Sequence, residues 1–200
     1  MNFRTKQARM VSAAIGALAA TVLAVSVTPA SAAASDGYIR GAGSIYDDFG
    51  DEGTLSTTSY SSSSATCFWQ SVLYAEGAMK NSESRFAKSD IDGEFGSKTK
   101  FATRNLQHRW GLTVDGIVGK NTMSKLDAKR VYNPDLDGGT WIGHLKYLRT
   151  TDNGNIVATY YGKYHSFGMV RAGSSGRWHF TDVSHSQLPS IAADYGRNSC

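Results

Sequence analysis

Residues 92–99 read DGEFGSKT, and residues 115–122 read DGIVGKNT. Both segments fit the pattern D-G-x-x-G-x-x-T, and the second begins 23 residues after the first. A glutamine-bearing apolar segment precedes each copy, WQSVL at 69–73 and LQHRW at 106–110. An internal repeat of this kind indicates one supersecondary unit used more than once. Two short units are too few for a solenoid, so we expect a small, pseudo-symmetric helical domain.

The repeated pattern is typical of a tight turn that leads into a helix. Its aspartate can accept nearby backbone N–H groups, and the glycine after it permits a positive φ. We expect the second glycine to let the turn close against the next helix and the threonine hydroxyl to bond back to the loop. The position before the second glycine, Phe95 or Val118, is expected to enter the core. The motif residues are Asp92, Gly93, Phe95, Gly96 and Thr99 in the first copy and Asp115, Gly116, Gly119 and Thr122 in the second.

Apolar residues recur at three- to four-residue spacing around both motifs, which predicts three helices. The first is expected to begin with Thr66 as its N-cap. The second covers about 97–110 and ends at Gly111, where a C′ glycine is favoured. The third, shorter helix covers about 121–130. Together they predict a compact three-helix bundle within a domain at 66–132.

The hydrophobic period changes to two after the Pro134–Gly139 break, which predicts a β-rich region over 133–200. Strands are expected near 141–149, 156–161, 163–171 and 178–183, with a turn at 152–154. Such a small antiparallel meander of three or four strands is marginal alone, so we expect it to pack on the helices. The predicted fold class is α+β.

The first 65 residues are expected to be a leader and a linker. Residues 1–32 combine a basic start, an apolar run and Ala30-Ser31-Ala32, which is typical of a secretory signal peptide cleaved after Ala32; an uncleaved membrane anchor is the alternative. Residues 33–65 are rich in Ser and Gly and predict a flexible tether, part of which can dock through its scattered apolar residues.

Charge and cysteine usage narrow the class of partner. Without the three basic residues of the leader, 18 Lys and Arg face 17 Asp and Glu, which does not favour nucleic acid. Cleavage of the leader would leave no stable membrane association. The two cysteines, Cys67 and Cys200, predict an intramolecular disulfide in an exported chain; free or intermolecular thiols are the alternative.

At these motifs the chain resembles the bacterial peptidoglycan-binding domain with a three-helix fold, often appended to cell-wall hydrolases. The resemblance covers about residues 66–130. Trp69 and Leu106 stand where that family has Leu and Phe, and the connection at 80–89 is long and polar. The matched residues are Trp69, Gln70, Leu73, the first motif, Leu106, Gln107, Gly111, Leu112, Val114 and the second motif.

The resemblance implies peptidoglycan as a non-covalent partner, bound by a secreted, cell-wall-associated protein. Cationic, amide and aromatic side chains suit its carboxylates, amides and sugar faces. The candidate ligand-binding residues are Arg104, Asn105, Gln107, His108 and Trp110 on the second helix. An ordinary solvated face, with Trp110 partly buried, is the alternative. For Gln70 and Gln107, hydrogen bonds from helix to turn are the alternative to ligand contact.

An enzyme is the rival interpretation. Four of the five histidines lie in the β-rich region, yet no H-E-x-x-H, H-x-H or G-x-S-x-G pattern occurs. Zinc ligands can still converge from separate strands. We therefore predict a non-catalytic, monomeric wall-binding protein without a cofactor or metal. A wall hydrolase with its site in the β-rich region, and a secreted interaction or inhibitor protein, are the alternatives.

Overall fold

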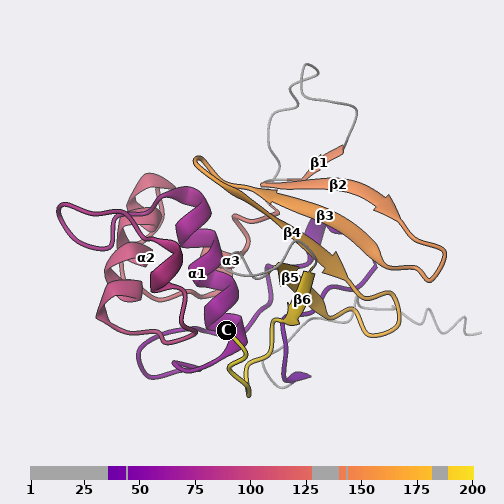
Figure 1. Cartoon of the computed structure of the whole chain (residues 1–200), viewed down its shortest axis with the longest axis horizontal. Helices are drawn as coiled ribbons and strands as arrows, with labels where there is room; N and C mark the ends of the chain where they lie inside the picture. Colours follow the sequence, from indigo (N-terminus) through magenta and orange to yellow (C-terminus); the bar gives the residue numbers. More distant parts are fainter. Residues whose placement is uncertain (1–35, 44, 128–139, 143, 182–188) are drawn as a thin grey trace, which may run out of the picture.

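The computed structural model describes residues 36–43, 45–127, 140–142, 144–181 and 189–200 (Figure 1). The expected signal peptide lies outside these residues. Helices and an antiparallel sheet form two sides of the molecule, and the C-terminus lies beside α1. The fold class is therefore α+β, as expected. The helical elements are η2 (Ile45–Asp47), α1 (Ser64–Glu76), η3 (Lys88–Asp90), α2 (Ser97–Arg109) and α3 (Lys120–Met123).

Two helix ends differ from the sequence prediction. The N-cap of α1 is Ser63, whose side chain accepts a hydrogen bond from the Thr66 backbone N–H, while the Thr66 hydroxyl donates to Tyr60 O. The prediction of Thr66 as N-cap was wrong because Ser63 already fills that role. Helix α3 is only four residues long and continues as turns to Asp127. Residues 128–130 of the predicted third helix lie outside the described part. The predicted C′ glycine is confirmed, since Gly111 has φ 68°.

The sheet follows the chain, and each strand pairs antiparallel with the next in sequence. Six strands are described, more than the three or four expected. The predicted strand at 141–149 is a hairpin, because Trp141 pairs with Lys146 and the chain reverses between them. The last strand begins at Pro189, a residue that disfavours strand prediction. The strands are β1 (Thr140–Ile142), β2 (Leu145–Thr150), β3 (Ile156–Tyr161), β4 (Ser166–Arg171), β5 (Trp178–Thr181) and β6 (Pro189–Ala192).

Helix α1 lies at the centre of the hydrophobic core. All but one of its residues are buried, including Phe68 and Trp69. The Phe68 ring lies 5.6 Å from that of Phe180 on β5 and 6.1 Å from that of Phe167 on β4. On the other side of α1, Trp69 Nε1 donates to Thr103 of α2 at 2.9 Å. The sheet therefore covers one side of α1 and α2 the other.

The segment before α1 is part of the fold. Ile39, Phe49 and Leu55 are fully buried. Ile39 exchanges backbone hydrogen bonds with the sheet region, and Leu55 pairs with Val118 of the second motif. The flexible-tether prediction is therefore corrected for the described residues between 36 and 65. Their composition is polar, but Ile39, Ile45, Phe49 and Leu55 enter the core, which was the docked alternative.

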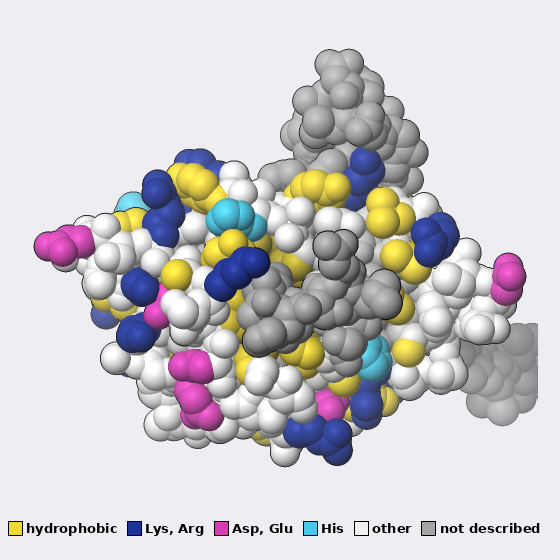
Figure 2. Space-filling view, in the orientation of Figure 1, with side chains coloured by type: hydrophobic (Ala, Val, Ile, Leu, Met, Phe, Trp, Pro, Cys, Tyr) yellow, Lys and Arg dark blue, Asp and Glu magenta, His cyan; other side chains and the backbone are white. Residues whose placement is uncertain are grey.

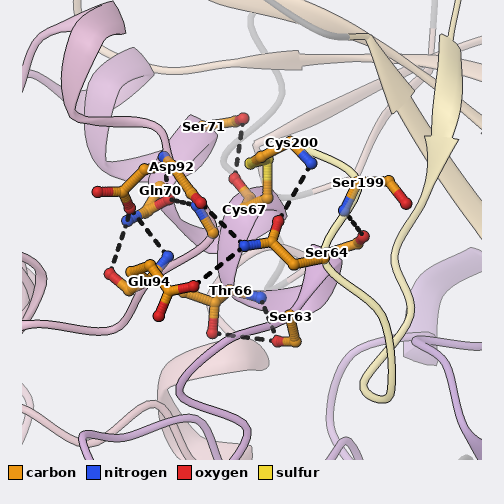
Figure 3. Close-up of a disulfide and its surroundings, with 12 residues drawn as sticks. Ser63, Ser64, Thr66, Cys67, Gln70, Ser71, Asp92, Glu94, Ser199 and Cys200 are labelled. Atoms are coloured by element: carbon orange, nitrogen blue, oxygen red, sulfur yellow. Dashed lines mark hydrogen bonds between the residues drawn. A yellow bond between two sulfur atoms is a disulfide. The ribbon is translucent and has the colours of Figure 1, made fainter.

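The predicted Cys67–Cys200 disulfide is confirmed, with Cα atoms 6.0 Å apart. It joins the first turn of α1 to the last residue of the chain, across 133 positions of sequence (Figure 3). Backbone hydrogen bonds from Ser64 to Arg197 and from Ala65 to Asp194 run beside it. The end of the chain is thus fastened along the start of α1 by a covalent bond and by hydrogen bonds.

Buried polar pairs join the helices and the N-terminal segment to the sheet. Glu76 at the end of α1 accepts hydrogen bonds from Tyr160 of β3 at 3.0 Å and from Arg109 of α2 at 3.0 Å, and its carboxylate lies 3.2 Å from His144 Nδ1. Asp48 pairs with Arg171 of β4 at 2.7 Å. Because each pair joins segments far apart in sequence, the pairs specify how the parts dock.

Candidate functional site

The first repeated turn is organised by the buried side chain of Gln70 on α1. Its Nε2 donates to Asp92 Oδ1, Glu94 O and Thr99 Oγ1 at 2.8, 3.0 and 3.1 Å. Its Oε1 accepts from the backbone N–H groups of Asp92 and Gly93 at 2.9 and 2.7 Å. Figure 3 shows Gln70 lying beside Asp92 and Glu94. One amide therefore connects a helix to a turn that begins 22 residues later.

The second turn repeats this arrangement around Gln107 of α2. Its Nε2 donates to Asp115 Oδ1, Ile117 O and Thr122 Oγ1 at 2.8, 2.9 and 3.2 Å. Its Oε1 accepts from Gly116 N at 2.8 Å. Gln107 is 1% exposed, and its two polar atoms are used by the turn. These contacts are the helix-to-turn hydrogen bonds that were the alternative to ligand contact for Gln107.

The two glycines of each motif have different roles. The first, Gly93 or Gly116, has a positive φ of 73° or 74°, as expected. A Cβ on Gly116 would also lie 2.8 Å from Lys100 Cγ and 2.9 Å from Arg104 Cγ. The second glycine has a negative φ and no atom within 4 Å of an added Cβ in either copy. The expectation that it permits close helix packing was wrong.

An open groove of about 610 Å³ lies beside the second turn. It is lined by the turn itself, by the connection after α2 and by the N-terminal segment. Sequence reasoning missed Glu52 and Thr54 because both come from the segment read as a tether. The lining residues are Glu52, Thr54, Gln107, Gly111, Leu112, Thr113, Asp115, Ile117, Gly119, Lys120, Asn121 and Thr122.

The five predicted ligand-binding residues do not act as one set in the structure. Arg104 and His108 are exposed on α2, and the Arg104 stem lies over Gly116 of the second turn. Asn105 is held by the fold, because its Oδ1 accepts from Met79 N at 2.9 Å. Trp110 is half-buried and meets Trp69 edge to face at 6.2 Å. Arg104 and His108 therefore remain the freest of the five.

Among the groove residues, Glu52 has a shifted pKa. Burial raises the pKa of Glu52 to about 7, although its carboxylate accepts hydrogen bonds from Tyr195 and from Arg40 N. Asp115 is different, because its Oδ1 is used by Gln107 and by Ile117 N. Lys120 is the cation of the lining. Near pH 7 the groove therefore combines one cation with one partly neutralised and one internally bonded carboxyl.

His144 and His165 of the β-rich region are packed against side chains of the helical part. His144 approaches Glu76 and lies 5.5 Å from the Trp110 ring, and His165 stacks on Tyr74 at 4.2 Å. His185 lies outside the described residues. Among the residues that are described, no three His, Cys, Asp or Glu side chains are grouped so that they could hold a metal ion. In the same part of the chain, no helix has the length and apolarity needed to cross a membrane.

Lys and Arg side chains are spread over the helical and sheet parts, and Asp and Glu lie among them, on the face of the molecule seen in Figure 2. The described surface on this face therefore has no broad area of one charge. This distribution agrees with the low net charge expected without the leader.

Two turns, each joined by a glutamine to a preceding helix, define a class of small helical domain. Residues 79–126 match the family described as putative peptidoglycan binding domain, which confirms the resemblance for this segment. The match begins after α1, although the contacts of Gln70 make α1 the structural counterpart of α2. No solved structure matches the chain.

A spore cortex-lytic enzyme of Halalkalibacterium halodurans is 42% identical over 51 residues. The aligned segment is 26% of this chain and 16% of that enzyme. The similarity is therefore to a small part of that enzyme.

Proposed function

We propose that this is a secreted, non-catalytic protein that binds peptidoglycan and is retained at the cell wall. The observation that carries the proposal is the pair of glutamine-centred turns in a segment, 79–126, that matches the peptidoglycan-binding family. The Cys67–Cys200 bond supports an oxidising location outside the cytosol. The protein acts as a monomer and needs no cofactor.

The binding surface combines the groove beside the second turn with the exposed part of α2. Arg104 and His108 offer charge and hydrogen bonds, and the half-buried Trp110 offers part of an aromatic ring. Lys120, Asn121 and Thr113 add polar groups within the groove. A volume of about 610 Å³ falls within the usual range for small-ligand sites.

The structural roles of Glu76 and His144 support the non-catalytic part of the proposal, because carboxylates and histidines are the residue types that a hydrolase would use. Glu76 is held by Arg109 and Tyr160, and His144 lies against it at the junction of helices and sheet. These contacts join parts of the fold, and we assign them to docking.

A wall hydrolase is the second candidate, favoured by the similarity to the cortex-lytic enzyme. The segment with the repeated turns in this chain is, however, built around structural hydrogen bonds. A hydrolytic site would therefore have to lie in the β-rich region.

Co-sedimentation with purified peptidoglycan sacculi tests the proposal, with the supernatant assayed for released fragments. We expect the oxidised protein to pellet with sacculi and to release nothing. Arg104→Ala is expected to weaken pelleting several-fold, and Lys88→Ala, an exposed change on the connection before α2, should leave it unchanged. Fragment release would favour the hydrolase. Failure to pellet at low and moderate salt would exclude peptidoglycan and favour a protein partner.

A further inference from the structure

The two turns share one hydrogen-bond pattern but differ in the connection that leads to them. Gln70 and Asp92 are 22 residues apart, whereas Gln107 and Asp115 are 8 apart. The longer connection folds back on the helices, with Ala78 and Phe86 buried and joined by a backbone hydrogen bond. The first turn therefore has an additional segment of chain beside it that the second turn lacks.

This additional segment places a buried carboxylate beside the first turn. Asp90 is 6% exposed and accepts hydrogen bonds from Lys80 Nζ at 2.6 Å, Lys98 Nζ at 3.2 Å and Ala87 N at 2.8 Å. Burial acts to raise the pKa of Asp90, but these donors outweigh it and hold the pKa below its usual range. The first turn thus carries an ionised internal carboxylate held mainly by lysines.

The same positions at the second turn line the open groove. The 23-residue offset between the motifs places Asn121 at the position of Lys98 and Thr113 at that of Asp90. Both Asn121 and Thr113 are exposed groove residues. The short connection 108–114 contains no acidic residue. The second turn therefore lies beside an open, polar groove. The connection 108–114 places no carboxylate in that groove.

We propose that the groove beside the second turn binds a free carboxylate of a short peptide, seated against Asn121 and Lys120 much as Asp90 is seated against lysines at the first turn. The inference rests on the proposed function, in which the peptide is the acidic stem of peptidoglycan. The groove exceeds the size of one carboxylate, so it accommodates neighbouring peptide groups, for which Thr54 and Thr113 offer hydroxyls.

The acidic residues of the lining are compatible with this ligand. Asp115 uses Oδ1 to organise the turn, and both Glu52 oxygens accept internal hydrogen bonds. Arg40 contributes its backbone N–H, Tyr195 its hydroxyl, and Asp36 and Asp51 act on Glu52 from nearby. Because the pKa of Glu52 is about 7, its repulsion of a carboxylate is reduced at and below neutral pH.

The test exchanges residues between the two turns and measures affinity by calorimetry. The probe is a synthetic stem tetrapeptide with free carboxylates, and the control probe is the same peptide fully amidated. Asn121→Lys introduces the lysine of the first turn and is expected to tighten binding of the free acid by up to roughly fivefold, the range for an exposed ion pair. Asn121→Asp is expected to weaken it similarly. The matched control Lys98→Ala, at the first turn, should leave affinity unchanged.

A second variant distinguishes a seated carboxylate from a general charge effect. Thr113→Asp combined with Asn121→Lys recreates the internal carboxylate of the first turn, so the double variant should bind the free acid more weakly than Asn121→Lys alone. Near-ultraviolet circular dichroism confirms that each variant is folded. Equal affinities of all folded variants for the free acid, or equal effects on the amidated peptide, would overturn the inference.

The sacculus experiment separates this inference from the proposed function. Pelleting that is unchanged by the Asn121 variants, together with no peptide discrimination, would leave wall binding in place and remove the carboxylate site. Peptide binding that follows the expected order, without pelleting, would keep the site and remove the wall as its source.

Discussion

At the residue scale, a buried glutamine is the element that each turn depends on. Gln107 Nε2 lies within hydrogen-bond distance of three acceptors, which share its two N–H groups, and Gln107 Oε1 accepts from Gly116 N. Gln70 is placed in the same way at the first turn. A primary amide suits this task because it carries two donors and one acceptor oxygen on a short planar group. The motif aspartate accepts hydrogen bonds from this amide and from the backbone N–H two residues later.

Gln107→Ala is expected to destabilise the protein by about 2–4 kcal/mol, because it leaves buried turn groups without partners. His108→Ala, one position further along α2 and exposed, should change stability by less than about 0.5 kcal/mol. Urea unfolding of both variants measures the difference. Equal stability of the two would show that the Gln107 contacts contribute little.

At the element scale, the C-terminal segment is bonded to the start of α1 and to the first turn. Asn198 donates to Asp92 O and Glu94 Oε1, Ser199 N donates to Ser64 Oγ, and Cys200 closes the disulfide (Figure 3). The segment itself is exposed, so it contributes little hydrophobic burial of its own. The covalent bond is therefore the main reason that it stays in place.

Cys200→Ala is expected to lower the free energy of unfolding by up to ~5 kcal/mol, because the 133-residue separation closes a long loop whose entropy is restored in the unfolded chain. Guanidinium unfolding with and without reductant measures this loss. The reductant should destabilise the wild-type protein and leave Cys200→Ala unaffected. An equal response of both proteins would contradict the assignment.

At the scale of the whole molecule, three buried carboxyls lie where the N-terminal segment meets the rest of the fold. Burial raises the pKa of Glu52 to about 7 and those of Asp48 and Asp127 to about 6. Arg171 opposes the effect at Asp48, and backbone N–H groups of Phe49 and Asp48 oppose it at Asp127. Their burial follows from the docking of a segment whose composition resembles a linker.

These carboxyls predict that stability decreases between about pH 4 and pH 7. The folded state holds their protons more tightly than the unfolded chain, so unfolding becomes easier as pH rises from their ordinary pKa values of 3.8–4.5 to the raised pKa values. Each pKa unit corresponds to ~1.4 kcal/mol. Glu76 and Asp90 have lowered pKa values and act in the opposite sense, losing their contribution only in more acidic solution.

Thermal unfolding at pH 5 and pH 8 measures the balance, and the melting temperature is expected to be higher at pH 5. Glu52→Gln removes one of the three groups and should reduce the difference between the two pH values. A melting temperature that rises from pH 5 to pH 8 would contradict the prediction.

Local chemistry determined the part of this protein that the sequence could predict. The two turns follow from residues within a few positions of one another, so Asp92, Gly93, Asp115 and Gly116 could be assigned their conformations directly. The strand at 156–161 matched its predicted bounds for the same reason. The disulfide followed because the chain offers only one pairing.

Tertiary structure alone decided what lies beside each turn. The offset between the motifs was visible in the sequence, but the burial of Asp90 between two lysines and the groove at Thr113 and Asn121 depend on how a long and a short connection pack. The burial of Ile39 and Phe49 likewise depends on surfaces supplied by the distant sheet and helices. Local sequence patterns do not indicate which distant surfaces a segment will contact. For this reason the sequence predicted a tether and did not predict the groove.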